Sequence, residues 1–279
     1  MLSDQQQAQF QVDGYLVIEN AFTPAQIAGV KQAALDIVAD FDADLHRTVF
    51  KTSDRDAGRD DYFFDSAEAV HCFLEEGALD EDGALLRSKE LAINKIGHAL
   101  HDLVPEFTQF CRLPLIGEAL RDLGYAQPLL WQTMYIFKQP GIGGEVRWHQ
   151  DASYLISKPP DVTGIWIAIE DAGLENGCLW VQPGGHHSPL REIYEVDWAR
   201  RKGELRTLDN TPWPSSDQAF ALEVAAGTAV FFSDHMPHYS SQNHSSRSRQ
   251  AFTLHVSESG VPWSEKNWLQ RHRLGDFLL

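Results

Sequence analysis

Two histidines and one aspartate are the residues of this chain whose types and spacing best suit a metal site. His149 and Asp151 lie two residues apart, and His238 lies far downstream. On a β-strand, residues two apart point to the same face, so His149 and Asp151 can act together. Two imidazoles and one carboxylate, with coordination positions left open, are the ligand set of non-haem Fe(II) oxygenases. We therefore take these three residues as candidate metal ligands.

Arg249 is the candidate partner for the carboxylate of a co-substrate. It begins a predicted strand and shares a face with Thr253 and His255 by the period of two. A cation at the buried start of a strand is costly without an anion beside it, and a guanidinium can hold a carboxylate through two parallel hydrogen bonds. A 2-oxo acid would chelate the metal through its C1 carboxylate and keto oxygen, so its far carboxylate would pair with Arg249. The hydroxyl of Ser240 can assist.

Each of these assignments has a structural alternative. A His-x-Asp pair alone is expected by chance, and only its place after an apolar strand and a Gly-rich turn favours a site. His235, three residues before His238, is the rival third ligand. Arg249 could be a surface residue at a strand end, and Arg247, which has the same strand parity but lies in a Ser-rich turn, is the second choice for the carboxylate.

The elements that must position these residues change in character along the chain. Residues 1–127 read as a helical support, with a Ser3 cap, a strand over Tyr15–Ile18 and a capping box at Thr23. Helical periodicity continues at 66–76, 93–104 and 114–123. Residues 51–62 read as an exposed acidic loop, and 51–65 could fold over the site as a lid.

After Pro128 the chain reads as short strands separated by Gly, Pro and Asn turns. The expected strands cover 129–137, 164–169, 178–181, 220–224, 228–232 and 250–256. Such spacing predicts a jelly-roll or sandwich core over about 128–260, with the helices packed on it as a layer. Residues 185–217 lack a clear pattern and predict an excursion over this core. We expect one domain over 1–279.

The amino-acid composition limits the kinds of partner and compartment that we expect for this protein. A formal net charge of −17 disfavours nucleic acid and anionic membranes. The three cysteines are widely spaced, which argues against a zinc-thiolate site and favours a reducing compartment. The sequence shows no signal peptide and no apolar run long enough to span a membrane. We expect a soluble cytoplasmic protein with a small-molecule substrate and leave its oligomeric state open.

Several longer motifs resemble the phytanoyl-CoA dioxygenase family of Fe(II)/2-oxoglutarate oxygenases. They cover 93–101, 134–140, 149–153, 174–180 and 242–251, and the resemblance runs from about residue 8 to Trp268. It implies a mainly β fold with flanking helices, built on a double-stranded β-helix (jelly-roll, cupin-like) core. It implies Fe(II) on His149, Asp151 and His238, with 2-oxoglutarate and O2 as co-substrates. By matching position, the 2-oxoglutarate pocket would be lined by Lys95, Met134, Gln150, Trp166, Ser240 and Arg249.

The resulting hypothesis is a dioxygenase that hydroxylates an unactivated C–H bond and releases succinate and CO2. The alternatives are a metal- and 2-oxoglutarate-binding sensor without turnover and, less favoured, a metal-dependent isomerase or hydrolase. The substrate side is assigned to Arg147, Tyr154, Lys138 and the Tyr62-Phe63 loop, and no basic cluster for a CoA phosphate is visible. His98 and His101 would share a helix with Lys95 and serve structural roles. His186 and His187 would lie in solvated loops.

Overall fold

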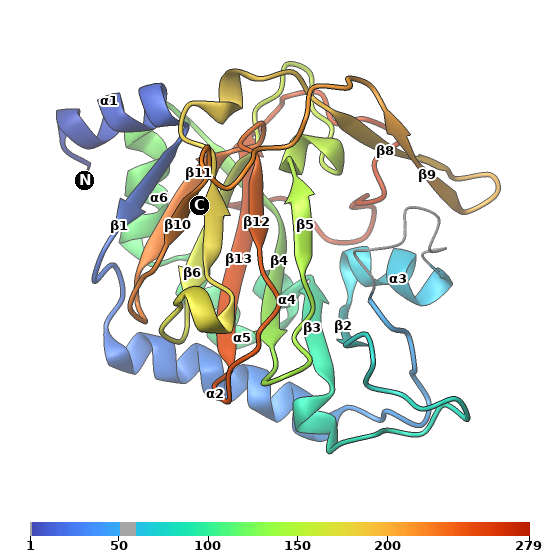
Figure 1. Cartoon of the computed structure of the whole chain (residues 1–279). Helices are drawn as coiled ribbons and strands as arrows, with labels where there is room; N and C mark the ends of the chain where they lie inside the picture. The colour runs from blue at the N-terminus through green and yellow to red at the C-terminus, as the bar shows by residue number, and fades with distance from the viewer. Residues whose placement is uncertain (1, 51–59) are drawn as a thin grey trace.

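Two antiparallel sheets face each other in the computed structural model, which describes residues 2–50 and 60–279 (Figure 1). The larger sheet contains, in spatial order, β1 (Tyr15–Ile18), β11 (Ala229–Ser233), β6 (Thr163–Ala168), β13 (Arg249–Glu258), β4 (Pro128–Lys138), β3 (Ile93–His98) and β2 (Val70–Leu74), with β14 (Phe277–Leu278) also on β4. The smaller sheet contains β10 (Phe220–Leu222), β7 (Leu179–Val181), β12 (His238–Ser240) and β5 (Val146–His149). This is the predicted double-stranded β-helix.

The central strands of the larger sheet, β11, β6 and β13, are buried along nearly their whole length. Alternate residues face the smaller sheet, among them Trp166, Val230 and Ala251, which pack with Leu179 and Val181. Their neighbours in sequence face the helices instead, as the period of two requires. Three residues of this apolar cluster, Trp166, Leu179 and Phe232, also line the cavity that holds the polar residues of the site.

Helices cover the outer face of the larger sheet (Figure 1). They include α2 (Pro24–Asp40), α4 (Leu100–Leu103), α5 (Pro105–Cys111) and α6 (Pro114–Asp122). The predicted capping box starts α2, because Thr23 accepts the backbone N–H of Gln26 while the Gln26 side chain accepts that of Thr23. In the core beneath, the rings of Phe107 and Phe252 lie 5.0 Å apart. Such packing holds the sheet rigid behind the site.

The strand predicted over Tyr15–Ile18 is confirmed as β1, whereas β2 and β3, which also come from the predicted helical region, extend the larger sheet. The helix predicted over 66–76 is wrong: Ser66–Glu68 forms one 3₁₀ turn and β2 follows. The helix over 93–104 is wrong in its first half, which is β3, while the helix over 114–123 is confirmed as α6. Alpha-helix α1 (Asp4–Asp13) begins at the predicted Ser3 cap. Residues 51–59 of the predicted loop and lid lie outside the described residues, and 61–62 belong to α3 (Asp61–Asp65).

The excursion predicted over 185–217 contains a hairpin of β8 (Glu192–Asp197) and β9 (Lys202–Thr207). This hairpin lies beside α3, at the same end of the molecule as the top of β5 (Figure 1). Tyr194 and Leu205 of the hairpin reach the cavity described below. The excursion therefore supplies part of the wall of the site.

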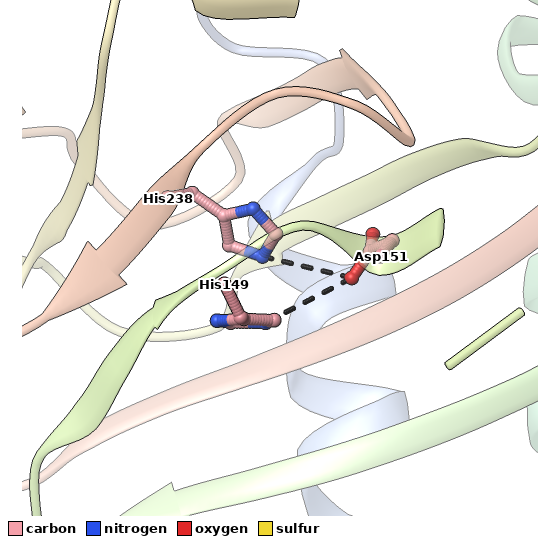
Figure 2. Close-up of side chains that lie close together, drawn as sticks. All are labelled: His149, Asp151 and His238. Atoms are coloured by element: carbon pink, nitrogen blue, oxygen red, sulfur yellow. Dashed lines mark ion pairs between the residues drawn. The ribbon is translucent and has the colours of Figure 1, made fainter. Parts of the chain in front are cut away.

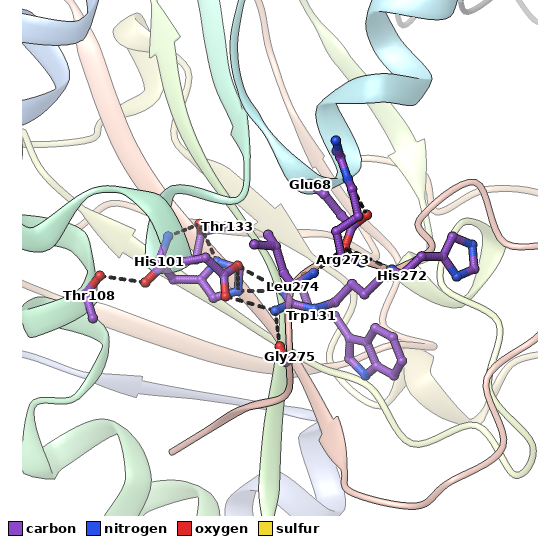
Figure 3. A network of polar contacts seen from close by, with 11 residues as sticks. Glu68, His101, Thr108, Trp131, Thr133, His272, Arg273, Leu274 and Gly275 are labelled. Carbon is purple, nitrogen blue, oxygen red and sulfur yellow. Dashed lines mark hydrogen bonds and ion pairs between the residues drawn. The ribbon is translucent and has the colours of Figure 1, made fainter.

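The C-terminal segment is held against the rest of the chain by Glu68 (Figure 3). Its carboxylate accepts the backbone N–H groups of His272, Arg273 and Leu274 at 2.9, 2.6 and 2.7 Å. Burial alone would raise the pKa of Glu68, but these hydrogen bonds lower it below its ordinary value. The segment they hold includes Trp268, which lines the cavity.

Candidate metal and co-substrate site

The side chains of the three candidate metal ligands point toward one another (Figure 2). His149 ends β5, Asp151 follows it by two residues, and His238 begins β12 directly opposite His149 in the sheet register. The Nε2 atoms of His149 and His238 lie 3.8 and 3.7 Å from the same Asp151 oxygen, Oδ1. One ligand atom from each residue lies within 4.8 Å of the others. Within the described part of the chain, no other group of His, Cys, Asp and Glu meets this geometry.

Hydrogen bonds set both imidazoles in the tautomer that a metal needs. Nδ1 of His149 lies 2.8 Å from the carbonyl of Arg147, and Nδ1 of His238 lies 3.0 Å from that of Met236. A carbonyl can only accept a hydrogen bond, so each Nδ1 carries the proton. Each Nε2 therefore keeps its lone pair free to bind a metal ion. The two rings are therefore ready to act as ligands.

The charge states of the site also suit a cation. Burial, together with the nearby His238, lowers the pKa of His149 to about 3, which keeps this imidazole neutral. Burial alone would raise the pKa of Asp151, but His255 and His238 hold it well below its ordinary range. The site thus presents two imidazole nitrogens and one carboxylate, the donor set predicted for Fe(II).

Two polar residues behind the aspartate were not assigned to the site from the sequence. Nε2 of His255 lies 3.2 Å from Asp151 Oδ2, and the Gln132 amide lies 3.1 Å from Nδ1 of His255. The strand period had placed His255 on the face of Arg249. Its contact with Asp151 joins β13 to the segment after β5, and local spacing could not reveal it.

A cavity of about 390 Å³ opens from the metal ligands between the sheets. Arg249 lines it and is only 2% exposed. Its Nε donates to the carbonyl of Gly177 at 3.1 Å, while its Nη1 is buried with no hydrogen-bond partner. Burial lowers the pKa of Arg249 to about 10. A buried guanidinium with an unused donor, without an acidic partner within 4.0 Å among the described residues, is a place for an anion.

Four of the other expected co-substrate residues line the same cavity, namely Lys95, Met134, Trp166 and Ser240. Trp166 lies beside Arg249, whose guanidinium carbon is 5.6 Å from the ring centre. Lys95 lies on β3 rather than on a helix, and its ammonium lies 3.4 Å from the centre of the Phe50 ring and 3.9 Å from the sulfur of Met134. These residues thus share one cavity with the metal ligands and Arg249.

Gln150 is the exception among the predicted pocket residues, and the structure places it elsewhere. Strand alternation turns it away from His149 and Asp151, and it is absent from the cavity wall. Its amide donates to the carbonyls of Pro189 and His235, and its carbonyl accepts the backbone N–H of Arg191. Gln150 therefore supports the chain around the site from behind.

The remaining histidines stay outside the metal cluster. His98 ends β3, binds Ser66 through Nδ1 at 2.8 Å, and also lines the cavity. His101 lies in α4, not on a helix with Lys95, and contacts Thr133 and Arg271 at 3.0 Å each (Figure 3). His235, the rival ligand, does not join the cluster. The structural reading of His101 is confirmed.

The residues assigned to the substrate side divide in two. Arg147, Tyr154 and Phe63 line the cavity. Lys138 also reaches it, but its ammonium donates to the carbonyls of Gly144 and Ser241 at 2.6 and 2.7 Å. Tyr62 does not reach the cavity, because its ring stacks on His71 instead.

Comparison with known proteins agrees with this geometry. The family model "Phytanoyl-CoA dioxygenase (PhyH)" matches residues 10–251. The chain belongs to the phytanoyl-CoA dioxygenase family. Among curated members, "Phytanoyl-CoA dioxygenase" of Arabidopsis thaliana is 40% identical, over 95% of this chain and 92% of that protein. "Phytanoyl-CoA dioxygenase domain-containing protein 1" of Mus musculus is 42% identical, over 96% of this chain and 95% of that protein.

Solved structures show the same fold at low sequence identity. EctD from S. alaskensis with bound Fe superposes with a TM-score of 0.63 at 20% identity, covering 97% of this chain and 82% of that chain. The α-ketoglutarate-dependent carbocyclase SnoK has a TM-score of 0.63 at 18% identity, covering 94% and 86%. The family, the fold and the His-Asp-His cluster together support an oxygenase. Among the described residues, no helix is long and apolar enough to cross a membrane.

Proposed function

We propose that the protein is an Fe(II)- and 2-oxoglutarate-dependent dioxygenase that hydroxylates an unactivated C–H bond of a small molecule. One observation carries this proposal: three ligand atoms converge in a cavity whose wall also holds the buried Arg249, which has no acidic partner among the described residues. Bound Fe(II) and 2-oxoglutarate would supply the O2-dependent oxidation, with succinate and CO2 as the products of the co-substrate. The residues of the chain bind and orient these groups.

The site fits both groups. The two histidines offer free Nε2 lone pairs, and Asp151 supplies the negative charge that a divalent cation requires. Arg249 would hold the far carboxylate of 2-oxoglutarate, with Ser240 and Trp166 beside it. Pairing with this carboxylate would relieve the cost of the buried charge on Arg249.

We place the organic substrate against the opposite wall, which is largely aromatic. Phe63 and Trp268 pack with ring centres 4.6 Å apart, and Tyr154 and Tyr194 lie 5.9 Å apart. Arg147 lines the same cavity and makes no ion pair with any described residue. A small molecule with an apolar body and one anionic group fits these walls. The three free, buried cysteines agree with a reducing compartment, for which we propose the cytoplasm.

The decisive experiment measures binding and turnover separately. Purified protein is titrated with Fe(II) and 2-oxoglutarate without O2, and succinate is quantified after O2 is admitted. We expect both ligands to bind and succinate to form slowly even without substrate. An Asp151→Ala variant should lose the metal, whereas a Glu175→Ala surface control should behave as the parent protein. Binding without succinate would instead identify the sensor, and the absence of binding would refute both.

A further inference from the structure

The two carboxylate oxygens of Asp151 have different neighbours. Oδ1 faces both candidate metal-binding nitrogens, at 3.8 Å from His149 and 3.7 Å from His238. Oδ2 faces away from them and lies 3.2 Å from Nε2 of His255. His255 is 5% exposed, so water does not compete for this contact. The carboxylate is therefore held with one oxygen toward the metal position and one oxygen occupied.

Gln132 decides which nitrogen of His255 carries the proton. It lies directly opposite His255 in the register of β4 and β13, and its Nε2 is 3.1 Å from Nδ1 of His255. The amide N–H donates to Nδ1, which must then accept, so the proton of His255 is on Nε2. Nε2 consequently donates to Asp151. The opposite arrangement would place a lone pair of His255 against a carboxylate oxygen, which is repulsive.

We propose that His255, oriented by Gln132, is a positioning residue that keeps Asp151 a one-oxygen ligand. A carboxylate can bind a metal through one or both oxygens. An octahedral ion with three protein ligand atoms retains three positions, enough for a chelating 2-oxo acid and O2. A second Asp151 oxygen would take one of them. Because Oδ2 accepts from His255, it is withheld, and the position stays open. This inference rests on the proposed function.

The test compares His255→Leu, which removes the donor, with His255→Gln, which retains an amide N–H. Co(II) replaces Fe(II) because it does not turn over, and its affinity is measured by calorimetry and its coordination by X-ray absorption. Loss of a residue behind a metal ligand typically costs 10- to 100-fold in metal affinity. We expect a loss of about this size in His255→Leu, a two-oxygen Asp151 in its spectrum, and recovery of most of the affinity in His255→Gln.

A second measurement uses the unaltered protein, so it tests the inference even if His255→Leu does not fold. Nitrogen-15 NMR of the Zn(II)-bound form should show the His255 proton on Nε2 and an unprotonated Nδ1. A proton on Nδ1 alone, or wild-type Co(II) affinity and coordination in a folded His255→Leu, would overturn the inference while leaving the proposed function intact. Failure of the parent protein itself to bind Co(II) would count against both.

Discussion

Replacing Arg249 by methionine tests the co-substrate site most directly, since methionine has similar length without charge. The unpartnered Nη1 of Arg249 is available for a carboxylate, and Nε is already bound to Gly177. Hydrogen bonds to charged groups contribute about 1.5–3 kcal/mol each. One such bond from Nη1 gives about 1.5–3 kcal/mol, which corresponds to a loss of roughly 10- to 10²-fold in 2-oxoglutarate affinity.

The same substitution should stabilise the protein without ligand. Burial lowers the pKa of Arg249 to about 10, against about 12.5 for the free side chain. The arginine side chain is charged at neutral pH in both the folded and the unfolded state. A pKa that is lower in the folded state therefore means that this charge destabilises the folded protein. At 1.36 kcal/mol per pKa unit this penalty is about 3 kcal/mol, and the lost bond to Gly177 offsets about 1 kcal/mol of the gain. The net gain of about 2 kcal/mol should raise Tm by about 4 °C.

The assay is calorimetric titration of 2-oxoglutarate into Mn(II)-loaded protein, paired with thermal unfolding of the metal-free protein. Arg247→Met is the matched control, because Arg247 is exposed, is paired with Glu175 and should change neither quantity. The reasoning is refuted if Arg249→Met binds 2-oxoglutarate within tenfold of the parent, or if its Tm falls by several degrees while Arg247→Met is unaffected.

Three further outcomes are expected. Gln150→Leu removes the partner of three backbone groups, of which the N–H of Arg191 is buried and the other two are partly buried, and should cost about 1–3 kcal/mol in urea unfolding, with unchanged 2-oxoglutarate affinity in calorimetry. Glu68→Gln should destabilise the protein at pH 7, because the lowered pKa of Glu68 stabilises the fold wherever the carboxyl is ionised in the unfolded chain. The difference in stability should shrink as the pH falls below about 4.3, the pKa of an unfolded glutamate. Urea unfolding of both proteins at pH 7 and at a pH below about 4.3 checks this. Mn(II) at 100 times its Kd should add about 2.7 kcal/mol to the stability of the parent and none to that of Asp151→Ala, as measured by thermal shift.

His149, Asp151 and Arg249 could be predicted because each depends on the strand period, whereas His238 is indicated by the following Ser240 and its distance from Arg249. That period puts His149 and Asp151 on one face and favours the start of the β13 strand for Arg249. The same rule, applied consistently, would have turned Gln150 away from the cavity, whereas the family resemblance placed it inside. The contact between His255 and Asp151 could not be predicted, because it depends on how two sheets pack.

The helices predicted over 66–76 and over the first half of 93–104 were wrong for a related reason. Strand β3 has the core on one face and the cavity on the other, and its last four residues are all buried. Its apolar residues Ile93 and Ile96 both pack in the core, because the irregular pairing with β2 at Asn94 shifts the alternation, and their spacing of three imitates a helix. Strand β2 likewise ends in three buried residues in succession. Strands buried on both sides lose the alternation by which sequence analysis distinguishes them from helices.

Strand β13 carries Arg249 at its first residue and His255 six residues later, so it serves both the co-substrate end and the metal end of the cavity. Its pairing with β4 is regular from Arg249 to His255, and the irregularity comes only between His255 and Val256. Inserting or deleting one residue inside the regular span would turn one of these two side chains toward the helices. Evolution can therefore vary this span by substitution but not by a single-residue change in length. Beyond His255, the irregular pairing between His255 and Val256 can absorb such a change.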